Sequence, residues 1–123
     1  MGTFSIPCRV ENLDRKRHMD LPALLVDSGS ESTWINEKQL EEIGIIREKD
    51  LTFFMANGQR ITRSVGFAIL HVAGTVAADE LVFAEEGDLQ SLGARTLAGL
   101  NMRVDSQRKK LVAAGPIPAA TAV

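Results

Sequence analysis

Short apolar stretches separated by turn residues run along the chain, and they predict a protein built mostly of β-strands. Apolar runs of about four to eight residues, bounded by glycine, proline, asparagine or aspartate, are typical of buried strands. The strands predicted in this way cover residues 4–10, 21–26, 51–55, 59–72, 81–84, 102–104 and 111–113. Many short strands of this kind favour a closed β-barrel or a sandwich.

Two short helices are predicted among the strands. Residues 36–43 have Asn36 as a suitable N-cap, apolar positions on one face and a glycine directly after the last of them. Leu97 and Leu100 lie on one side of a second helical pattern that follows Gly93. The fold is therefore expected to combine a dominant sheet with one or two minor helices.

Turn signals organise the chain into hairpins within one domain. Asn57-Gly58 is the strongest hairpin dipeptide in the sequence. Pro7 indicates that the first strand lies at an edge of the sheet, because proline cannot donate a hydrogen bond to a neighbouring strand. No repeat and no linker divides the 123 residues, so we expect a single domain with its core at residues 4–113 and a loose tail at residues 114–123.

Composition and charge narrow the range of functions. An apolar fraction of 45% and a charged fraction of 24% are ordinary for a globular chain that buries a modest core. The net charge of -2 gives no electrostatic reason to expect a nucleic acid or an anionic membrane as partner. No apolar run approaches the roughly 20 residues of a membrane helix, and no signal-peptide core is present. We therefore expect a cytoplasmic protein, although a signal or anchor removed from the chain would leave no trace in this sequence.

The residues that commonly bind metals are few and scattered. Cys8 is the only cysteine, so an internal disulfide cannot form and nothing indicates secretion. His18 and His71 have no metal-ligand spacing with Cys8 or with each other. The sequence therefore predicts neither a metal site nor a cofactor.

One stretch of the sequence carries candidate chemistry. An apolar run over residues 23–26 stops at Asp27, Ser28 and Gly29, and large apolar residues resume at Trp34. A carboxylate at the end of a buried strand is costly unless it is hydrogen-bonded or shares a proton, and glycine lets the backbone turn tightly beneath it. This pattern indicates an acid held at the edge of the sheet. An ordinary strand-to-turn transition favours the same residue types, so the motif alone leaves both interpretations open.

Three features, in order along the chain, resemble the retropepsin-like aspartic proteases. The first is Leu-Leu-Val-Asp-Ser-Gly-Ser at residues 24–30, which is similar to the catalytic motif of the family. The second is Met-Ala-Asn-Gly-Gln at residues 55–59, which resembles a bacterial variant of the flap hairpin. The third is Ser-Leu-Gly-Ala-Arg-Thr-Leu at residues 91–97, followed by a predicted strand, which resembles the element packed behind the active site. Together the similarity spans residues 5–113, nearly the whole chain.

The resemblance implies a single acid-protease domain that works as a homodimer. Family members hydrolyse peptide bonds with two aspartates that share one proton and activate a water molecule. This chain contains one Asp-Ser-Gly sequence, so two copies of Asp27 would have to meet on a twofold axis. The expected activity is that of an aspartic endopeptidase acting on extended polypeptides with apolar residues beside the cleaved bond.

The resemblance also assigns roles to other residues. Ser28 would brace the two active-site turns across the twofold axis, and the Gly29 N–H would approach one carboxylate oxygen. Ser30 would donate to the other oxygen, and because a donor to the charged form lowers a carboxyl pKa, an acidic activity optimum is expected. The remaining expected positions are the flap at Ala56, Asn57 and Gly58, the apolar substrate pocket at Ile35, Val65 and Leu92, and Gly93 behind the active site.

Two departures from the family pattern and two alternative functions remain open. Ser91 occupies a position that is usually apolar, and Glu31 and Arg95 approximate an Asp–Arg ion pair of some viral members, with the arginine one position later. The same fold would also suit a non-catalytic dimerisation or peptide-binding module, or a protease domain active only within a larger parent chain. The intact Asp-Ser-Gly motif favours the enzyme, because a binding module has no use for a carboxylate there.

Overall fold

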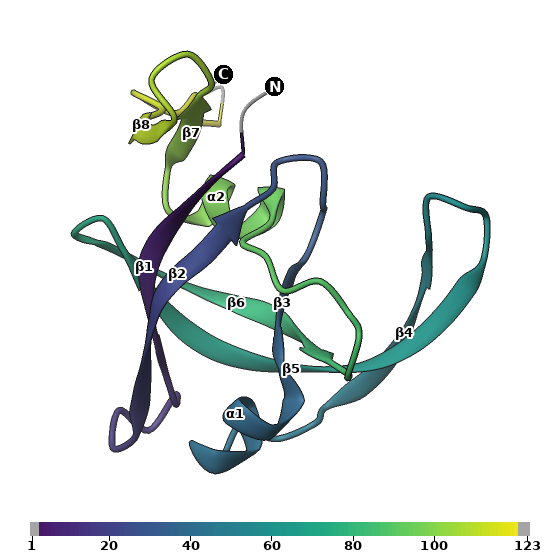
Figure 1. Cartoon of the computed structure of the whole chain (residues 1–123). Coiled ribbons are helices and arrows are strands. Elements are labelled where there is room, and N and C mark those ends of the chain that lie inside the picture. The colour runs from purple at the N-terminus through teal and green to yellow at the C-terminus, as the bar shows by residue number, and fades with distance from the viewer. Residues whose placement is uncertain (1–2, 121–123) are drawn as a thin grey trace.

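The computed structural model describes residues 3–120, which form one curved, mostly antiparallel sheet and a separate two-stranded hairpin (Figure 1). Its strands are β1 (Phe4–Glu11), β2 (His18–Val26), β3 (Thr33–Asn36), β4 (Lys49–Phe54), β5 (Arg60–Val72), β6 (Thr75–Ala84), β7 (Met102–Asp105) and β8 (Lys110–Ala113). Its helices are α1 (Glu37–Glu42) and α2 (Ala94–Gly99). The predicted mostly β class with two short helices is confirmed.

The main sheet is open, so the expected closed β-barrel is wrong. Its strands follow the order β2-β1-β5-β6-β3, and β4 pairs with β5 outside this path. The long strand β5 changes partners along its length, because residues 60–65 pair with β4 and residues 65–72 pair with β6. In the described residues, the end strands β2 and β3 do not pair with each other, and only single bridges, from Val26 to Leu92 and from Trp34 to Ser91, span the gap between them. The result is an open sheet with a projecting hairpin (Figure 1).

The first strand lies inside the sheet, contrary to the prediction from Pro7 that it forms an edge. β1 pairs with β2 on one side and, from Cys8 onward, with β5 on the other. Proline is tolerated at this position because the register between β1 and β2 shifts between Ile6 and Cys8. Pro7 lies there opposite two residues of β2, Pro22 and Ala23, so the ladder is irregular at this point and does not require the N–H that proline lacks.

Local sequence signals account for the two helices. The Asn36 side chain accepts hydrogen bonds from the backbone N–H groups of Lys38 and Gln39, so it caps α1 as predicted. Gly44, with a φ of 78° in the left-handed region, follows the end of α1. Helix α2 begins after Gly93 without a side-chain cap and packs against β6 and β7.

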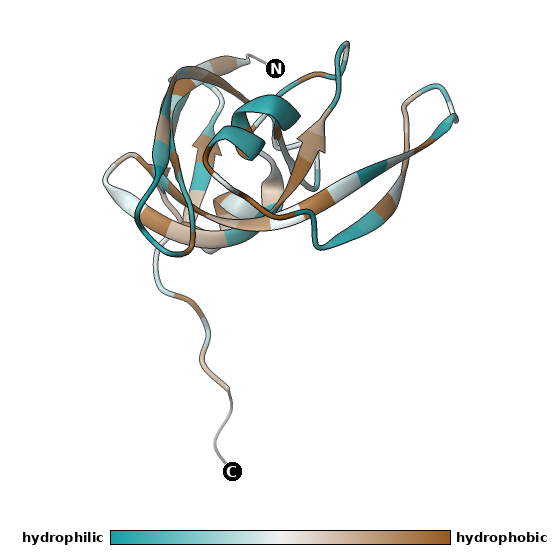
Figure 2. Ribbon diagram, turned by 90° about the horizontal axis from the view of Figure 1, so that it is seen from below, coloured by the Kyte–Doolittle hydropathy of each residue, from teal (hydrophilic) through white to brown (hydrophobic). Residues whose placement is uncertain are grey.

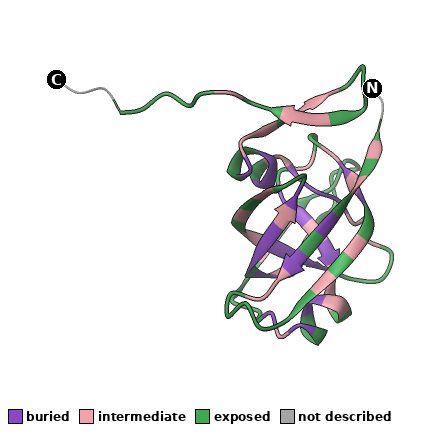
Figure 3. Cartoon of the chain, turned by 90° about the vertical axis from the view of Figure 1, so that its left-hand side faces the viewer, coloured by how far each residue is buried: buried purple, intermediate pink, exposed green. Residues whose placement is uncertain are grey.

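The core combines buried apolar side chains of β1, β2, β3, β5 and β6 with Leu40 of α1 and Leu97 of α2. Apolar stretches follow the strands, whereas α1 is largely hydrophilic (Figure 2). Buried positions concentrate in the central strands (Figure 3). The largest fully buried side chains are those of Phe83, Ile35, Leu40, Leu70, Leu81, Leu92, Val10, Val65, Val72, Val82, Thr33 and Thr96. In the part of the chain that the structure describes, no helix is long and apolar enough to cross a membrane.

The chain leaves the domain shortly after β8. The predicted hairpin around residues 106–109 is confirmed, since β7 and β8 pair as an antiparallel two-stranded sheet. The Ala114 N–H donates to the Asn101 carbonyl oxygen at 2.9 Å, and the Asn101 side chain donates to the Gly115 carbonyl oxygen at 3.0 Å. Residues 116–120 are exposed and extend away from the domain (Figure 3).

Candidate active site

The turn that follows β2 presents the Asp27 carboxylate at the surface. β2 ends at Val26, which is buried; Asp27 is half-buried, and Ser28 and Gly29 are exposed. The Gly29 N–H donates to Asp27 Oδ1 at 3.0 Å, and the Ser30 N–H donates to the Asp27 carbonyl oxygen at 3.1 Å. The expected approach of the Gly29 N–H to the carboxylate is present, and the turn fixes the orientation of the acid.

The backbone segment of Ser91 and Leu92, far along the chain, supports the Asp27 turn through hydrogen bonds. The Asp27 N–H donates to the Leu92 carbonyl oxygen at 3.0 Å, and the Leu92 N–H donates to the Leu25 carbonyl oxygen at 2.7 Å. On the other side, Ser91 and Trp34 exchange two backbone hydrogen bonds of 2.9 and 3.0 Å. The segment is thus inserted between the end of β2 and β3, and it ties the backbone of the acid to the core of the sheet.

Gly93 lies against the loop after the acid, at a place where no side chain fits. A Cβ added there would overlap the Ser32 carbonyl oxygen and lie 2.9 Å from the Ser30 carbonyl oxygen. The Ala94 N–H donates to that same Ser30 oxygen at 2.7 Å. The start of α2 therefore packs directly against the backbone of the active-site loop, at the position expected for Gly93.

A buried chain of hydroxyl groups extends this support from the loop to β6. The Gly93 N–H donates to Thr33 Oγ1 at 2.9 Å, the Oγ1 atoms of Thr33 and Thr96 are 2.6 Å apart, and Thr96 Oγ1 donates to Asp79 Oδ2 at 2.7 Å. Because an ionised carboxylate only accepts, the Thr96 hydroxyl proton points to Asp79, and the Thr33 hydroxyl must then donate to Thr96. Each hydroxyl in the chain therefore has one defined orientation.

The hairpin of β4 and β5 projects from the sheet, and its end lies near the Asp27 turn (Figure 1). The Met55 N–H donates to the Gln59 carbonyl oxygen at 2.8 Å, and the Gly58 N–H donates to the Met55 carbonyl oxygen at 2.9 Å. Gly58 has a φ of 85°, which favours glycine, and the Asn57 side chain accepts from the Gln59 N–H. The predicted Asn-Gly hairpin turn is confirmed.

A cavity of about 470 Å³ lies between the Asp27 turn, the hairpin end and the loop that follows β6. Of the expected flap residues, Ala56 lines the cavity, whereas Asn57 and Gly58 form the exposed turn beyond it. Apolar side chains from three separate elements make up much of the wall. The lining residues are Asp27, Gly29, Ser30, Trp34, Phe54, Met55, Ala56, Gly87, Asp88, Leu89 and Ser91.

The three residues expected to form the apolar substrate pocket do not line this cavity. Ile35, Val65 and Leu92 have no exposed surface and belong to the interior. In extended backbone, successive side chains point to opposite faces, so the cavity is lined by Trp34 and Ser91, the neighbours of Ile35 and Leu92. For Ile35 and Leu92, the prediction therefore chose the residue that faces the core. The two-residue period of extended backbone is the signal that identifies Trp34 and Ser91 as the neighbours that face the cavity.

Ser30 does not have the role expected for it. Its hydroxyl donates to the Ser32 carbonyl oxygen at 2.9 Å instead of to the Asp27 carboxylate. The side chain therefore stabilises the loop, and the expectation of an acidic optimum loses this support.

Arg95 also has partners other than the one suggested by the sequence. Its backbone N–H donates to the Glu31 carbonyl oxygen at 3.0 Å, but its guanidinium group lies 3.5 Å from a Glu80 oxygen and 3.8 Å from an Asp79 oxygen. Arg95 thus supplies positive charge beside the carboxylate at the end of the hydroxyl chain.

A second cavity, of about 370 Å³, opens on another side of the Asp27 turn. It lies between the start of β1, the Asp-Ser-Gly turn and the β7–β8 hairpin, and its lining residues are Thr3, Phe4, Val26, Asp27, Ser28, Gly29, Val104 and Ser106. Asp27 and Gly29 line both cavities. The acid is therefore accessible from two directions.

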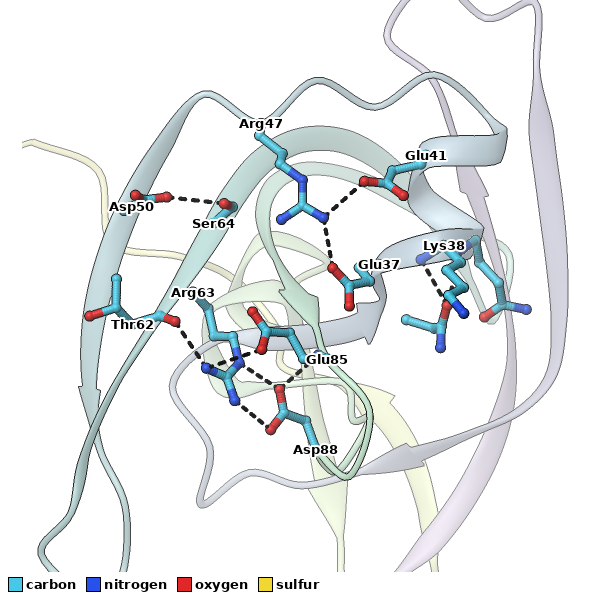
Figure 4. Close-up of polar contacts among 12 residues, drawn as sticks. Glu37, Lys38, Glu41, Arg47, Asp50, Thr62, Arg63, Ser64, Glu85 and Asp88 are labelled. Atoms are coloured by element: carbon cyan, nitrogen blue, oxygen red, sulfur yellow. Dashed lines mark hydrogen bonds and ion pairs between the residues drawn. The ribbon is translucent and has the colours of Figure 1, made fainter.

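The other carboxylate at the first cavity, Asp88, is already paired. Arg63 on β5 donates to Asp88 Oδ2 from Nε at 2.7 Å and to Asp88 Oδ1 from Nη2 at 3.0 Å (Figure 4). This hydrogen-bonded guanidinium, with a further contribution from the backbone N–H of Glu85, holds the pKa of Asp88 below its usual value. Asp88 therefore stays ionised and engaged, while the Asp27 carboxylate accepts one backbone hydrogen bond, from Gly29, in the described residues.

Comparisons with known proteins do not add to this geometry. No model of a known protein family matches the chain, and no curated protein matches its sequence. Among residues 3–120, no group of three or more histidine, cysteine, aspartate or glutamate side chains is placed to hold a metal ion. The proposal of a function therefore depends on the arrangement around Asp27.

Proposed function

We propose that this chain is an aspartic endopeptidase of the retropepsin-like type that acts as a homodimer on extended polypeptides. The observation that carries the proposal is the position of Asp27. Its carboxylate is half-buried at the end of a core strand, is oriented by the Gly29 N–H and opens onto two cavities. An acid placed in this way is suited to chemistry rather than to stabilising the fold.

Peptide hydrolysis by carboxylates needs two of them in contact, and this chain supplies one. One carboxyl group must be ionised to act as the base, and the other must be protonated to act as the acid. Two carboxyl groups in contact meet both conditions because they share one proton. Asp88 is unsuitable as the partner of Asp27, because its two oxygens are occupied by Arg63 and by the Glu85 N–H. A second copy of Asp27 is the remaining source, and the 370 Å³ cavity beside Ser28 gives its turn a place to enter.

The chemical steps follow from one shared proton. The ionised Asp27 removes a proton from water while the protonated copy donates its proton to the carbonyl oxygen of the substrate, and the water oxygen attacks the carbonyl carbon. The tetrahedral intermediate collapses when the peptide nitrogen takes up a proton from the pair, the C–N bond breaks, and one hydroxyl of the intermediate returns its proton to the pair as the new carboxyl group forms. The dyad ends with one proton, as it began, and titrates as a unit.

The first cavity is suited to an extended peptide. It lies between the hairpin end and the loop after β6, and Trp34, Phe54, Met55 and Leu89 offer apolar surface there. A hairpin whose end shares the cavity with the acid can close over a bound chain and exclude water. The same cavity would serve a non-catalytic peptide-binding module, which is the second candidate, but such a module needs no free carboxylate at Asp27.

The test is cleavage of an unfolded protein at about pH 3 to 6, where one carboxyl of a pair is protonated. Wild type should cleave, Asp27→Asn should not, and Asp14→Asn, which alters an exposed loop carboxylate, should cleave as wild type does. Adding an equal amount of Asp27→Asn to wild type should lower the rate by about half, because mixed dimers hold one carboxylate. Absence of cleavage by wild type, or full activity of Asp27→Asn, would refute the proposal, and an unchanged rate in the mixture would refute the shared site.

A further inference from the structure

An ion pair joins the projecting hairpin to the wall of the first cavity. Arg63 lies on β5 close to where the hairpin leaves the sheet, and Asp88 follows β6 (Figure 4). The two side chains meet in a fork of two hydrogen bonds, of 2.7 and 3.0 Å, and retain only 16% and 11% of their exposure. A paired arginine fork with little exposure fixes both position and orientation more firmly than an exposed ion pair does.

The pair also determines the shape of the loop that carries Asp88. Asp88 Oδ2 accepts from the Glu85 N–H at 2.8 Å, and the Asp88 N–H donates to the Glu85 carbonyl oxygen at 3.0 Å. Gly87 has a φ of 89°, which closes the turn. Leu89 comes next, with 64% of its surface exposed, and lines the cavity together with Asp88. Arg63 is not a lining residue, so it acts on the cavity through Asp88.

We propose that Arg63 is a positioning residue that holds the loop of residues 85–89 so that its cavity-lining part, residues 87–89, forms a charge-neutral wall, and that this wall selects a large apolar substrate side chain beside Leu89. The inference rests on the proposed proteolytic function and names the side-chain class that the site takes. Its basis is the pairing of Asp88 with Arg63, which cancels the second carboxylate charge at the cavity.

The two charges have opposite effects when either is removed. Arg63→Gln leaves Asp88 with uncompensated negative charge at the wall, which attracts a basic side chain and repels an acidic one. Asp88→Asn leaves Arg63 with excess positive charge, which has the opposite effect. This second effect is the weaker one, because the Glu85 carboxylate lies 3.7 Å from the Arg63 guanidinium and takes up part of the charge.

The experiment compares peptides that are identical except for leucine, lysine or glutamate at one position near the cleaved bond. We expect wild type to prefer leucine, and Arg63→Gln to raise kcat/KM for lysine relative to glutamate by about tenfold, mostly through KM. Asp88→Asn should shift the ratio in the other direction by a smaller factor. Exchanging both side chains for neutral amides, Arg63→Gln with Asp88→Asn, removes both charges, keeps an acceptor for the Glu85 N–H and should restore the preference for leucine.

A matched control shows whether a change in substrate preference comes from charge at the cavity wall or from the loss of any ion pair on the protein. Arg9 forms the same two-bond fork with Asp20, at 2.8 and 3.2 Å, between β1 and β2 and outside this cavity. Arg9→Gln should leave the preference unchanged. Circular dichroism establishes that each variant is folded. If Arg63→Gln does not fold, the peptide preferences of Asp88→Asn and of the double variant test the inference.

Each outcome decides the inference. Opposite shifts in the two single variants, with restoration in the double variant, support it. Cleavage by all variants with an unchanged lysine-to-glutamate ratio, or shifts in the same direction, overturns the inference and leaves the proposed function intact. Absence of cleavage and of peptide binding by wild type overturns both.

Discussion

Replacing Gly93 with alanine should be among the most damaging single-methyl changes in this protein. The added Cβ would overlap the Ser32 carbonyl oxygen and lie 2.5 Å from the Ser32 carbonyl carbon and 2.9 Å from the Ser30 carbonyl oxygen. All three atoms belong to the backbone, so no flexible side chain can move aside. Either the loop after Asp27 or the start of α2 must shift.

The expected loss of stability follows from the contacts that the shift disturbs. Overpacking of a closely packed site costs about 1–3 kcal/mol. The hydrogen bonds from the Ala94 N–H to Ser30 and from the Arg95 N–H to Glu31, of 2.7 and 3.0 Å, join the two segments that must separate, and each contributes about 1 kcal/mol. The total is about 3–5 kcal/mol, a large part of the 5–15 kcal/mol that is typical of a small domain.

Urea denaturation monitored by circular dichroism measures this loss. With a slope of about 2 kcal/mol per molar urea, the midpoint of Gly93→Ala should fall by roughly 2 M. Gly66→Ala is the positive comparison, because its Cβ would overlap the Ile46 carbonyl oxygen, again a backbone atom. Gly99→Ala is the matched control, since its Cβ would contact only the Ala77 methyl group at 3.3 Å. We expect a change below about 1 kcal/mol there, because alanine also favours the helix.

The reasoning would be refuted if Gly93→Ala unfolded within about 1 kcal/mol of wild type or at the same urea concentration as Gly99→Ala. Amide exchange gives a local check by nuclear magnetic resonance. The N–H groups of Ala94 and Arg95 should exchange faster in Gly93→Ala than in wild type under conditions where both proteins are folded. Unchanged exchange at these two groups would show that the clash is relieved elsewhere.

Three further predictions follow from the buried and charged groups. Thr96→Val should destabilise the fold by about 1–3 kcal/mol, because it leaves the buried Thr33 hydroxyl and the Asp79 carboxylate without their shared partner; Thr96→Ser should recover much of this loss in urea titrations. The pKa of Asp88 is lower in the folded than in the unfolded chain, so its stabilising effect is present above about pH 4 and is lost as the pH falls further; Asp88→Asn should show a shallower fall of the urea midpoint in that range. Burial raises the pKa of the Cys8 thiol to about 12, so Cys8 should react with a disulfide reagent at pH 8 only after urea is added, and rapid reaction of the folded protein would contradict its burial.

Much of the fold could be predicted because it depends on local patterns. The cap at Asn36, the hairpin turn at Asn57-Gly58 and the strands other than β3, which was not predicted, follow from residue types and their period. The edge position of β1 was wrong because β5 pairs with β1 from Cys8 onward, whereas Pro7 lies before this pairing begins and opposite an irregularity of β2, and such an irregularity has no local sequence signal of its own. The closed barrel was wrong because, in the described residues, the end strands β2 and β3 are joined only by single bridges to Leu92 and Ser91, which lie far along the chain.

Part of the candidate site could likewise be predicted from local sequence patterns, and part could not. Asp27 and the glycine beside it could be found from an apolar run that ends at an acid, and the structure orients that acid with the Gly29 N–H. The pocket walls at Ile35, Val65 and Leu92 were wrong because apolar character alone does not distinguish a core-facing side chain from a cavity-facing one. The Arg63–Asp88 pair joins residues far apart in sequence, and no spacing rule identifies such a contact.

Strand β5 gives the projecting hairpin a built-in pivot. Val65 is the residue at which β5 pairs with both β4 and β6, and Gly66 directly after it fits tightly against the chain at Ile46. The outer part of the strand therefore extends like a lever from a point fixed in the interior, and its direction is set far from its exposed end. Substitutions at the tip can vary what the lever touches, whereas substitutions at the pivot would change where it points.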